Sequence, residues 1–345
     1  MDLAEILDAL KKNLLTPIPL CFALGIFCKV IHGGIKIPKE LYYTIAIYLL
    51  MSIGFIGGHE LANVGLSTVA VPALVTLVIG ILTPISAYVV LRYVGRLSVA
   101  DSAGIAAHYG STSAVTYAVA NDYAIQHDHA PSAYLPTLVT ILECPGIAVA
   151  LALGAVLAVK PAEKFEVEGT EKPKSRLAEA LYEVITGQSI MLMAGLLLIG
   201  YISTKSMLPA SLEPFIHFFY SKEMIFRGAL CIFLLEMGLV AGERIRDLAK
   251  VGPFLIAFGV LVPLFHAFVA VWLGHKAGMN LGGCTIFGAI VSSASYIAAP
   301  PAVRLTLPEA NPTYSITAAL AITFPFNIAL GIPIYYQMAK FVGAT

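Results

Sequence analysis

Ten long apolar stretches run through this sequence, and they constrain its fold more than any motif does. A bilayer core about 30 Å thick needs about 20 apolar helical residues to cross it. The spans that we predict are 14–32, 38–57, 69–91, 98–120, 134–159, 187–204, 223–242, 252–274, 282–304 and 312–340. The sequence therefore predicts an all-α polytopic membrane protein with ten transmembrane helices.

The composition excludes the main alternatives to a membrane protein. The 345 residues are 58% hydrophobic and 12% charged, with a mean hydropathy of +0.84. A soluble domain carries about 25% charged residues, so this chain lacks the charge that covers a soluble surface. Its 21 Lys and Arg residues balance 21 Asp and Glu residues, which leaves no basic field for nucleic acid. The five cysteines have no CxxC or Cys/His ligand spacing, so we expect no transition-metal site.

The sequence also lacks the motifs of the common enzyme classes. His59 and Glu60 resemble the start of an HExxH zinc motif, but Asn63 stands where the second histidine belongs. The chain has no GxSxG elbow, no P-loop and no GxGxxG fingerprint. We therefore predict that the protein is not an enzyme and has no cofactor. Because the sequence has no ATP site, any transport across the membrane by this protein would be driven by an ion gradient or would follow the gradient of the substrate itself.

The distribution of Lys and Arg predicts the orientation of the chain in the membrane. Thirteen of these residues fall in loops on one side and six on the other, and the richer side is cytoplasmic by the positive-inside rule. Both termini then lie outside the cytoplasm, in a multi-pass protein of the inner (plasma) membrane. The polar segment 160–186 becomes a cytoplasmic linker between a first unit, 1–159, and a second unit, 187–345.

The two units read as copies of one sequence. Four pairs of segments align in the same order at offsets of 179 to 184 residues: LLMSIGFIGG with LLEMGLVAG, GILTP with GVLVP, GSTSAV with SSASYI, and ILECPGI with AITFPFN. Gly54 aligns with Gly238 and Gly58 with Gly242. Because each unit holds five spans, an odd number, the copies must insert in opposite directions. Inverted repeats are typical of secondary transporters, and a duplicated scaffold or a channel remains the alternative.

The fourth and ninth predicted spans are unusually rich in glycine, serine and threonine. We predict breaks at Gly110–Ser113 and Ser292–Ser295, the second followed by Pro300 and Pro301, which end or kink a helix. Broken backbone is tolerated in a bilayer only where protein or a water-filled cavity replaces lipid, and its free N–H groups attract anions. The alternative is that the small residues serve close helix packing. The predicted substrate-binding residues are Gly110, Ser111, Thr112, Ser113, Ser292, Ser293 and Ser295.

One carboxyl group lies in the middle of a predicted span, and such groups are functional by default. Glu143 precedes Pro145, and its repeat-related position is Thr323, which precedes Pro325. Because both prolines free carbonyl oxygens, we predict that Glu143, Thr323 and Asn327 bind a coupling sodium ion. The alternative is a protonated glutamic acid that bonds between helices. Four other ionisable side chains are predicted to be structural: Arg227, Glu236, His108 and His266.

These same segments resemble a known family. The run 292–336 is similar to the C-terminal signature of the sodium-dependent bicarbonate transporter family (SbtA type). GSTSAVTYAVA (110–120), ECPG (143–146) and the GHEL and GERI loops also look like that family, in the same ten-span order. One position differs, because the cyanobacterial members carry an acidic residue shortly before the Pro-Pro pair, where this chain has Tyr296. The chain therefore resembles the broader bacterial branch of the superfamily.

The resemblance implies a fold and an activity. It implies two inverted five-helix repeats with discontinuous fourth and ninth helices, divided into core and gate domains, in a homotrimer. It implies sodium-coupled symport of a small anion, with bicarbonate as the leading candidate, by an elevator-type movement, with Na⁺ as the coupling ion. It places the substrate between the broken helices, where Tyr296 joins the predicted substrate-binding residues, and it allows a PII-like regulator at the cytoplasmic face. Another small monocarboxylate as substrate, a passive anion channel, and a scaffold without transport activity are the alternatives.

Overall fold

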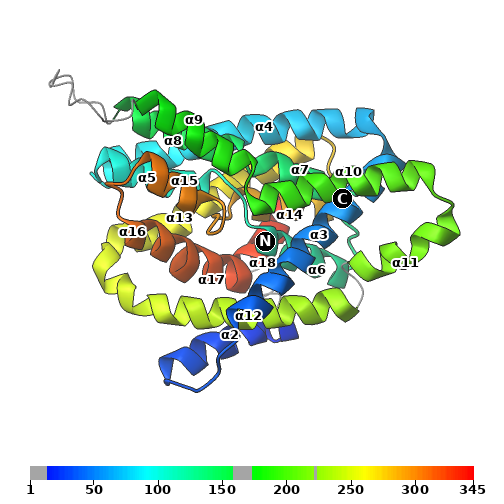
Figure 1. The fold of residues 1–345 in the computed structure, drawn as a ribbon, viewed down its shortest axis with the longest axis horizontal. Coiled ribbons are helices and arrows are strands. Elements are labelled where there is room, and N and C mark those ends of the chain that lie inside the picture. Colours follow the sequence, from blue (N-terminus) through cyan, green and yellow to red (C-terminus); the bar gives the residue numbers. More distant parts are fainter. Residues whose placement is uncertain (1–13, 158–172, 221–223) are drawn as a thin grey trace.

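The fold was analysed in a computed structural model that describes residues 14–157, 173–220 and 224–345. Within these ranges all regular structure is helical, and no strand occurs. The predicted linker 160–186 is therefore described only from residue 173 onward, as the helix α9. Figure 1 shows the helices packed into one body, with α4 along one edge and α2 and α12 along the opposite edge.

The described helices follow the predicted spans closely. They are α2 (Pro17–Val30), α3 (Lys39–Val64), α4 (Leu66–Val89), α5 (Val99–Tyr109), α6 (Ala114–Gln126), α7 (Leu135–Leu142), α8 (Pro145–Leu157), α9 (Pro173–Ile185), α10 (Gln188–Ser206), α11 (Pro209–Phe219), α12 (Met224–Arg244), α13 (Leu248–Lys276), α14 (Leu281–Val291), α15 (Ala299–Thr306), α16 (Pro312–Thr317), α17 (Phe324–Phe326) and α18 (Ile332–Phe341). Short π-helical segments follow α4 and join α16, α17 and α18.

Six helical segments are long and apolar enough to cross a membrane: Lys39–Val64, Ser67–Val94, Leu135–Leu157, Gln188–Ser206, Pro209–Lys276, which is described only at 209–220 and 224–276, and Pro312–Phe341. They contain seven of the ten predicted spans, because Pro209–Lys276 holds both 223–242 and 252–274. The first predicted span forms the shorter apolar helix α2, and the fourth and ninth are interrupted. The structure thus describes a helical membrane protein, while the count of ten spans stays a prediction.

The interruptions of the fourth and ninth spans have local causes. Helix α5 ends at Tyr109 and α6 begins after Ser113, whose hydroxyl accepts a hydrogen bond from the backbone N–H of Thr116 at 3.2 Å. Such a cap satisfies one of the orphan N–H groups at a helix start. Helix α14 ends at Val291, and the chain becomes helical again only at Ala299, directly before the two prolines.

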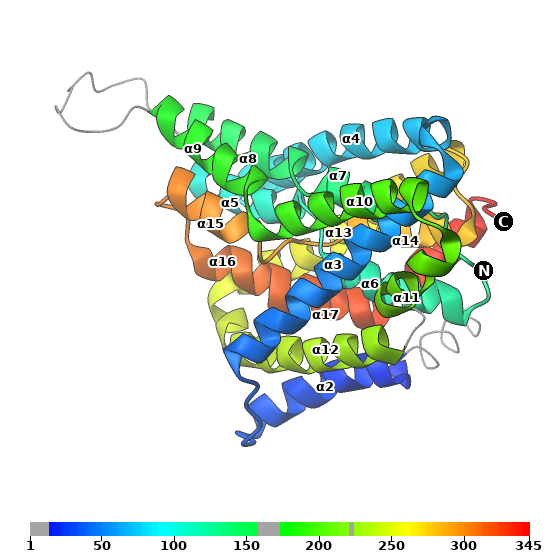
Figure 2. The ribbon, with the colours of Figure 1, turned by 45° about the vertical axis from the view of Figure 1, so that its right-hand side comes forward.

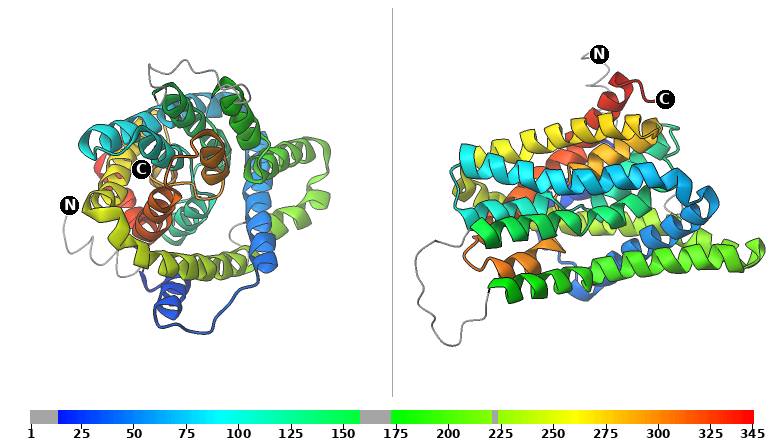
Figure 3. Two further views of the ribbon diagram at one scale, coloured as in Figure 1. Left: turned by 60° about the vertical axis from the view of Figure 1, so that its left-hand side comes forward. Right: turned by 90° about the horizontal axis from the view of Figure 1, so that it is seen from above.

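Two helix pairs are packed unusually closely, α3 with α10 and α2 with α12. A Cβ placed on Gly58 would lie 1.9 Å from the carbonyl oxygen of Leu197 in α10, and one on Gly200 would lie 2.2 Å from that of Phe55. On the other pair, a Cβ on Gly238 would lie 2.1 Å from the carbonyl oxygen of Phe22. Only glycine permits such backbone contact. We call α2, α3, α10 and α12 the helix wall; Figures 2 and 3 show it beside the remaining helices.

Two elements were not predicted as helices. Helix α11 follows α10 after a short turn and packs the ring of Phe219 against Phe55 of α3, with ring centroids 4.9 Å apart. Helix α9 lies in the predicted linker and contacts α15. Helix α11 has only 11 residues and α9 is largely polar, so neither forms an apolar stretch long enough to be predicted as a span of its own.

Candidate functional site

The two interrupted helices cross, and their extended segments are hydrogen-bonded to each other. The backbone N–H of Ser295 donates to the carbonyl oxygen of His108 at 2.8 Å, and the imidazole Nδ1 of His108 lies 2.6 Å from the carbonyl oxygen of Ser295. Because a carbonyl only accepts, Nδ1 carries the proton and donates. We call the segments 110–113 and 292–298 together the crossing. His108, predicted to be a structural histidine, joins the last turn of α5 to the second of these segments.

Hydroxyl groups hold the centre of the crossing together. Thr112 and Ser293 both donate to the carbonyl oxygen of Ile290, at 3.1 and 2.7 Å. The backbone N–H of Ser113 donates in turn to the Ser293 hydroxyl at 2.8 Å. Ser292 donates to the carbonyl oxygen of Ala289 at 3.1 Å. The hydroxyls of Ser292 and Ser293 are therefore used within the protein, which supports a structural role for these two predicted site residues.

Gly110 serves packing within the crossing. A Cβ on Gly110 would lie 2.8 Å from the Cα of Gly146, and one on Gly146 would lie 1.8 Å from the carbonyl oxygen of Gly110. The first break thus rests directly on the start of α8, immediately after Pro145. This contact brings Glu143, in the turn between α7 and α8, beside the crossing.

Glu143 is buried and bonded to the first break. The hydroxyl of Ser111 lies 3.0 Å from both the carbonyl oxygen and the carboxyl Oε2 of Glu143. Only 3% of the Glu143 surface is exposed, and no ion pair joins this carboxyl group to a cation of the described residues. A buried carboxyl group without a charged partner is costly unless it is protonated or binds a cation.

Thr323 and Asn327 lie at the crossing but apart from Glu143. The hydroxyl of Thr323 donates to the carbonyl oxygen of Gly259 at 2.7 Å and therefore accepts from Tyr109, at 2.6 Å. The amide of Asn327 donates to the carbonyl oxygen of Ser292 at 3.3 Å and accepts from the Tyr335 hydroxyl at 2.6 Å. Both residues are fully buried. They support the two breaks, and neither shares a hydrogen bond or a cavity wall with Glu143.

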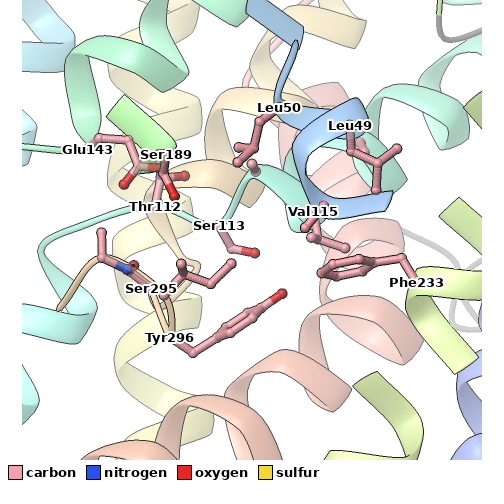
Figure 4. Close-up of a pocket in the computed structure, with 15 residues that line it drawn as sticks. Leu49, Leu50, Thr112, Ser113, Val115, Glu143, Ser189, Phe233, Ser295 and Tyr296 are labelled. Atoms are coloured by element: carbon pink, nitrogen blue, oxygen red, sulfur yellow. Dashed lines mark hydrogen bonds between the residues drawn. The ribbon is translucent and has the colours of Figure 1, made fainter. Parts of the chain in front are cut away.

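A cavity of about 30 Å³ lies between the crossing and the helix wall. Of the predicted site residues, it is lined by Thr112, Ser113, Ser295, Tyr296 and Glu143. In the same measure about 10–15 Å³ holds one water molecule, so the cavity has room for about two. Figure 4 shows Glu143 and Thr112 on one side of this cavity and the ring of Tyr296 extending toward its opposite side.

The helix wall supplies the other half of the cavity, which sequence patterns did not indicate. Leu49 and Leu50 of α3, Ser189 of α10 and Phe233 of α12 face the crossing (Figure 4). These are ordinary residues of apolar spans, and no spacing distinguishes them from other core residues. The α6 residues Ala114 and Val115 also line the cavity, and the first N–H groups of a helix lack intrahelical acceptors, so this end suits an anion.

Two other ionisable side chains find partners that tie helices together. The Nη2 of Arg227 in α12 lies 2.9 Å from Oδ1 of Asp122 in α6. The Nε2 of His266 in α13 lies 2.6 Å from the hydroxyl of Ser86 in α4. Because Ser86 itself donates to a carbonyl oxygen, this histidine donates through Nε2. These contacts agree with the structural roles that were predicted for Arg227 and His266.

Comparison with known families gives the class of this helical membrane protein. The sequence profile of the Na⁺-dependent bicarbonate transporter superfamily matches residues 17–340, nearly the whole chain. The protein belongs to this superfamily, which is a family of transporters rather than enzymes. No curated protein matches the chain.

Proposed function

We propose that this protein is a secondary active transporter that carries bicarbonate into the cell together with sodium. The observation that carries the proposal is the crossing of two interrupted helices at a cavity that holds a buried carboxyl group. Interrupted helices of this kind form substrate and ion sites in secondary transporters. The family assignment supports sodium and bicarbonate as the transported pair.

The charges around the cavity explain why an anion would need sodium. Among the described residues that line the cavity, none is positively charged and Glu143 carries the one carboxyl group. A bicarbonate ion would be repelled by an ionised Glu143, and the N-terminal dipole of α6 supplies only about half a positive charge. A sodium ion bound first would compensate one of these two negative charges, and the dipole of α6 would offset about half of the other. The proposed symport therefore has an order, sodium before bicarbonate.

The predicted ligands take different parts in this proposal. Glu143 binds sodium, with the hydroxyl of Ser111 beside its carboxyl group. Ser113, Thr112 and Ser295 line the cavity and contact the anion. Gly110, Ser292, Ser293, Thr323 and Asn327 act indirectly, because their side chains or small size hold the backbone of the crossing. Tyr296 closes one side of the cavity and limits the size of the substrate.

We infer an elevator-type movement from the position of the cavity. The crossing belongs to a core domain, and the helix wall belongs to a gate domain against which the core slides. The central cavity of about 30 Å³ lies between larger cavities of about 200 Å³ beside Glu60 and about 280 Å³ beside Glu183. Sliding of the crossing along the wall would connect the central cavity first with the cavity beside Glu60 and then with the cavity beside Glu183. The wall stays intact because its helix pairs are held by backbone contact at glycine.

Packing symmetry supports the proposed inverted repeats of 1–159 and 187–345. Gly54 and Gly238 align in the sequence repeat, and a Cβ on either would lie within 2.6 Å of a backbone oxygen of the paired helix. In addition, Gly65 before α4 and Gly252 near the start of α13 have similar backbone angles, φ 82° with ψ 154° and φ 76° with ψ 166°. Only glycine adopts such angles readily. Equivalent glycines at the third and eighth spans fit two copies of five spans each.

The surroundings of the protein complete the proposal. The loop charges support an inner (plasma) membrane protein with both termini outside the cytoplasm. The family resemblance supports a homotrimer and a PII-like regulator at the cytoplasmic face. Another small monocarboxylate is the second candidate substrate, because the hydroxyl side chains and the first residues of α6 that line the cavity suit any small oxyanion.

Uptake into proteoliposomes tests the function. We expect labelled bicarbonate to accumulate with an inward sodium gradient, to saturate with concentration and to stop when sodium is replaced by choline. A passive channel would carry current without sodium, and a scaffold would carry none. Competition by formate, acetate and other small carboxylates ranks the second candidate against bicarbonate, and stronger inhibition by one of these would reassign the substrate.

A further inference from the structure

A second polar cavity, of about 200 Å³, lies between α3, α6 and the segment 130–133. Its polar side chains are those of Glu60 in α3, Tyr117 and Asn121 in α6, Ser132, and Tyr220 after α11. Glu60, Tyr117 and Tyr220 lie close enough to interact electrostatically with one another. No positively charged side chain of the described residues lines this cavity.

The cavity is aligned with the central site along two shared helices. Helix α3 lines the central cavity at Leu49 and Leu50 and lines the second cavity at Ile56 and Glu60. Helix α6 does the same with Ala118 and then Asn121. At a rise of about 1.5 Å per residue, Glu60 lies about 15 Å along α3 from the central site. The seam between α3 and α6 therefore leads from the second cavity to the crossing.

Among the described residues, no Lys or Arg side chain lines the cavity beside the carboxyl group of Glu60. No ion pair or hydrogen bond joins it to the described residues, and the ring of its chain neighbour His59 bonds to Thr204 and Asn63 instead. Nδ1 of His59 donates to the Thr204 hydroxyl at 2.9 Å, and Nε2 accepts from the Asn63 amide at 3.3 Å. Because Thr204 itself donates to the carbonyl oxygen of Gly200, it must accept from His59.

A second side chain in the cavity also lacks a partner. Tyr117 is 6% exposed and lines the cavity, and its hydroxyl makes no hydrogen bond within the described part of the chain. The hydroxyl itself is not fully enclosed, so water or a cation in the cavity can reach it. An anionic carboxylate beside phenolic oxygens offers the hard oxygen ligands that alkali and alkaline-earth cations prefer. With a single carboxylate, the set suits a monovalent cation better than a divalent one.

We propose that Glu60 and Tyr117 form an outer cation site that binds sodium before it reaches the crossing. The inference rests on the proposed function, because it places a recruiting site on the path of the coupling ion. By the loop charges, this cavity lies toward the outer face of the membrane, where both termini are expected. The site concentrates sodium beside the α3–α6 seam, and at the same time it compensates the carboxylate that would repel an approaching anion.

The test is a sodium titration of the purified full-length protein, with choline replacing sodium at constant ionic strength. Wild type, Glu60→Gln, Tyr117→Phe and the control Glu213→Gln are compared by melting temperature and by bicarbonate uptake. Glu213 is an exposed carboxylate of α11 that does not line the cavity. For Glu60→Gln we expect the sodium concentration for half-maximal uptake and half-maximal rise in melting temperature to increase about tenfold. The reason is that one charged ligand contributes about a factor of ten to ion affinity. Uptake at saturating sodium should stay within about twofold.

Each outcome decides the proposal. A smaller shift for Tyr117→Phe, and none for Glu213→Gln, supports the site. Sodium curves of Glu60→Gln that coincide with wild type overturn it, as does a loss of melting temperature that is equal with and without sodium. If Glu60→Gln does not fold, Tyr117→Phe and Glu60→Asp decide by the same curves. In a further outcome, wild type shows no sodium-dependent uptake while sodium still raises its melting temperature, and Glu60→Gln shifts that sodium dependence. In that case the proposed transport function is wrong, but the proposed cation site is supported.

Discussion

The helix wall and the crossing bring backbones together by opposite means. In the wall, glycines let unbroken helices touch, as at Gly58 against Leu197 and Gly238 against Phe22. In the crossing, the helices are broken, and hydrogen bonds such as that between Ser295 and His108 join the extended segments. Contact between apolar helices requires only that their surfaces fit together. An interrupted helix also requires a hydrogen-bond partner for each exposed backbone N–H and C=O group. The comparison indicates a stable frame beside a polar region that can exchange protein partners for ions.

The largest effect is expected from adding a methyl group to the glycine contacts of the wall. Gly58→Ala would place Cβ 1.9 Å from the carbonyl oxygen of Leu197, a backbone atom that cannot move aside. We expect about 3 kcal/mol or more of destabilisation and little folded protein. The matched control is Gly195→Ala, since a Cβ there meets nothing within 4 Å, and we expect it to fold as well as wild type. Yield and melting temperature in detergent measure both, and a normal melting temperature for Gly58→Ala would show that the wall is loosely packed.

Next in size is the loss of the buried carboxyl group beside the crossing. Glu143→Gln keeps the volume and the hydrogen bond to Ser111 but removes the charge that we propose attracts sodium. We expect sodium-driven uptake to fall at least tenfold, because charge-assisted contacts to a buried group contribute about 1.5–3 kcal/mol. Folding should be kept, since a neutral amide is easier to bury. Uptake over a sodium titration is the measurement, and an unchanged sodium dependence would remove Glu143 from the ion site.

A moderate effect is expected on the other side of the crossing. The Tyr335 hydroxyl donates to the side-chain oxygen of Asn327, and Asn327 holds the carbonyl oxygen of Ser292. Tyr335→Phe leaves a buried amide oxygen without a donor, which costs about 1–3 kcal/mol. We expect a lower melting temperature and slower uptake, with the sodium concentration for half-maximal uptake unchanged. Tyr43→Phe is the control, because that ring is exposed. A shifted sodium dependence would instead make Asn327 an ion ligand.

Sequence patterns predicted the polar crossing better than they predicted the apolar helix wall. The breaks near Gly110–Ser113 and Ser292 were predictable because glycine, hydroxyl side chains and prolines in an apolar run have few other uses. The cavity residues Leu49 and Phe233 were not, since apolar side chains that face a site look like those that face lipid or core. Thr323 and Asn327 were grouped with Glu143 by their repeat-related positions, and the structure places them with Tyr109 and Tyr335 instead. Residues that align between two repeats occupy equivalent positions in the two copies, but they need not lie close together in the fold.

The smallest effect concerns the ion pair that links the two regions. Arg227 of α12, in the wall, lies 2.9 Å from Asp122 of α6, which belongs to the helix that follows the first break. Because Arg227 is 41% exposed, solvent screens the pair, and we expect a coupling of about 1 kcal/mol or less in a double-mutant cycle of Asp122→Asn and Arg227→Gln. Melting temperatures with and without both changes measure this coupling.

Uptake separates this pair from an ordinary surface contact. The control pair, Asp247 and Lys250, lies within one short segment at 2.7 Å and does not link the wall to α6. If the core slides along the wall, the Asp122–Arg227 pair must break in each cycle, so its loss changes the rate of uptake, whereas loss of the control pair does not. If loss of the Asp122–Arg227 pair changes the uptake rate no more than loss of the control pair does, α6 and α12 move together. The boundary between moving and fixed parts would then lie elsewhere than between the crossing and the wall.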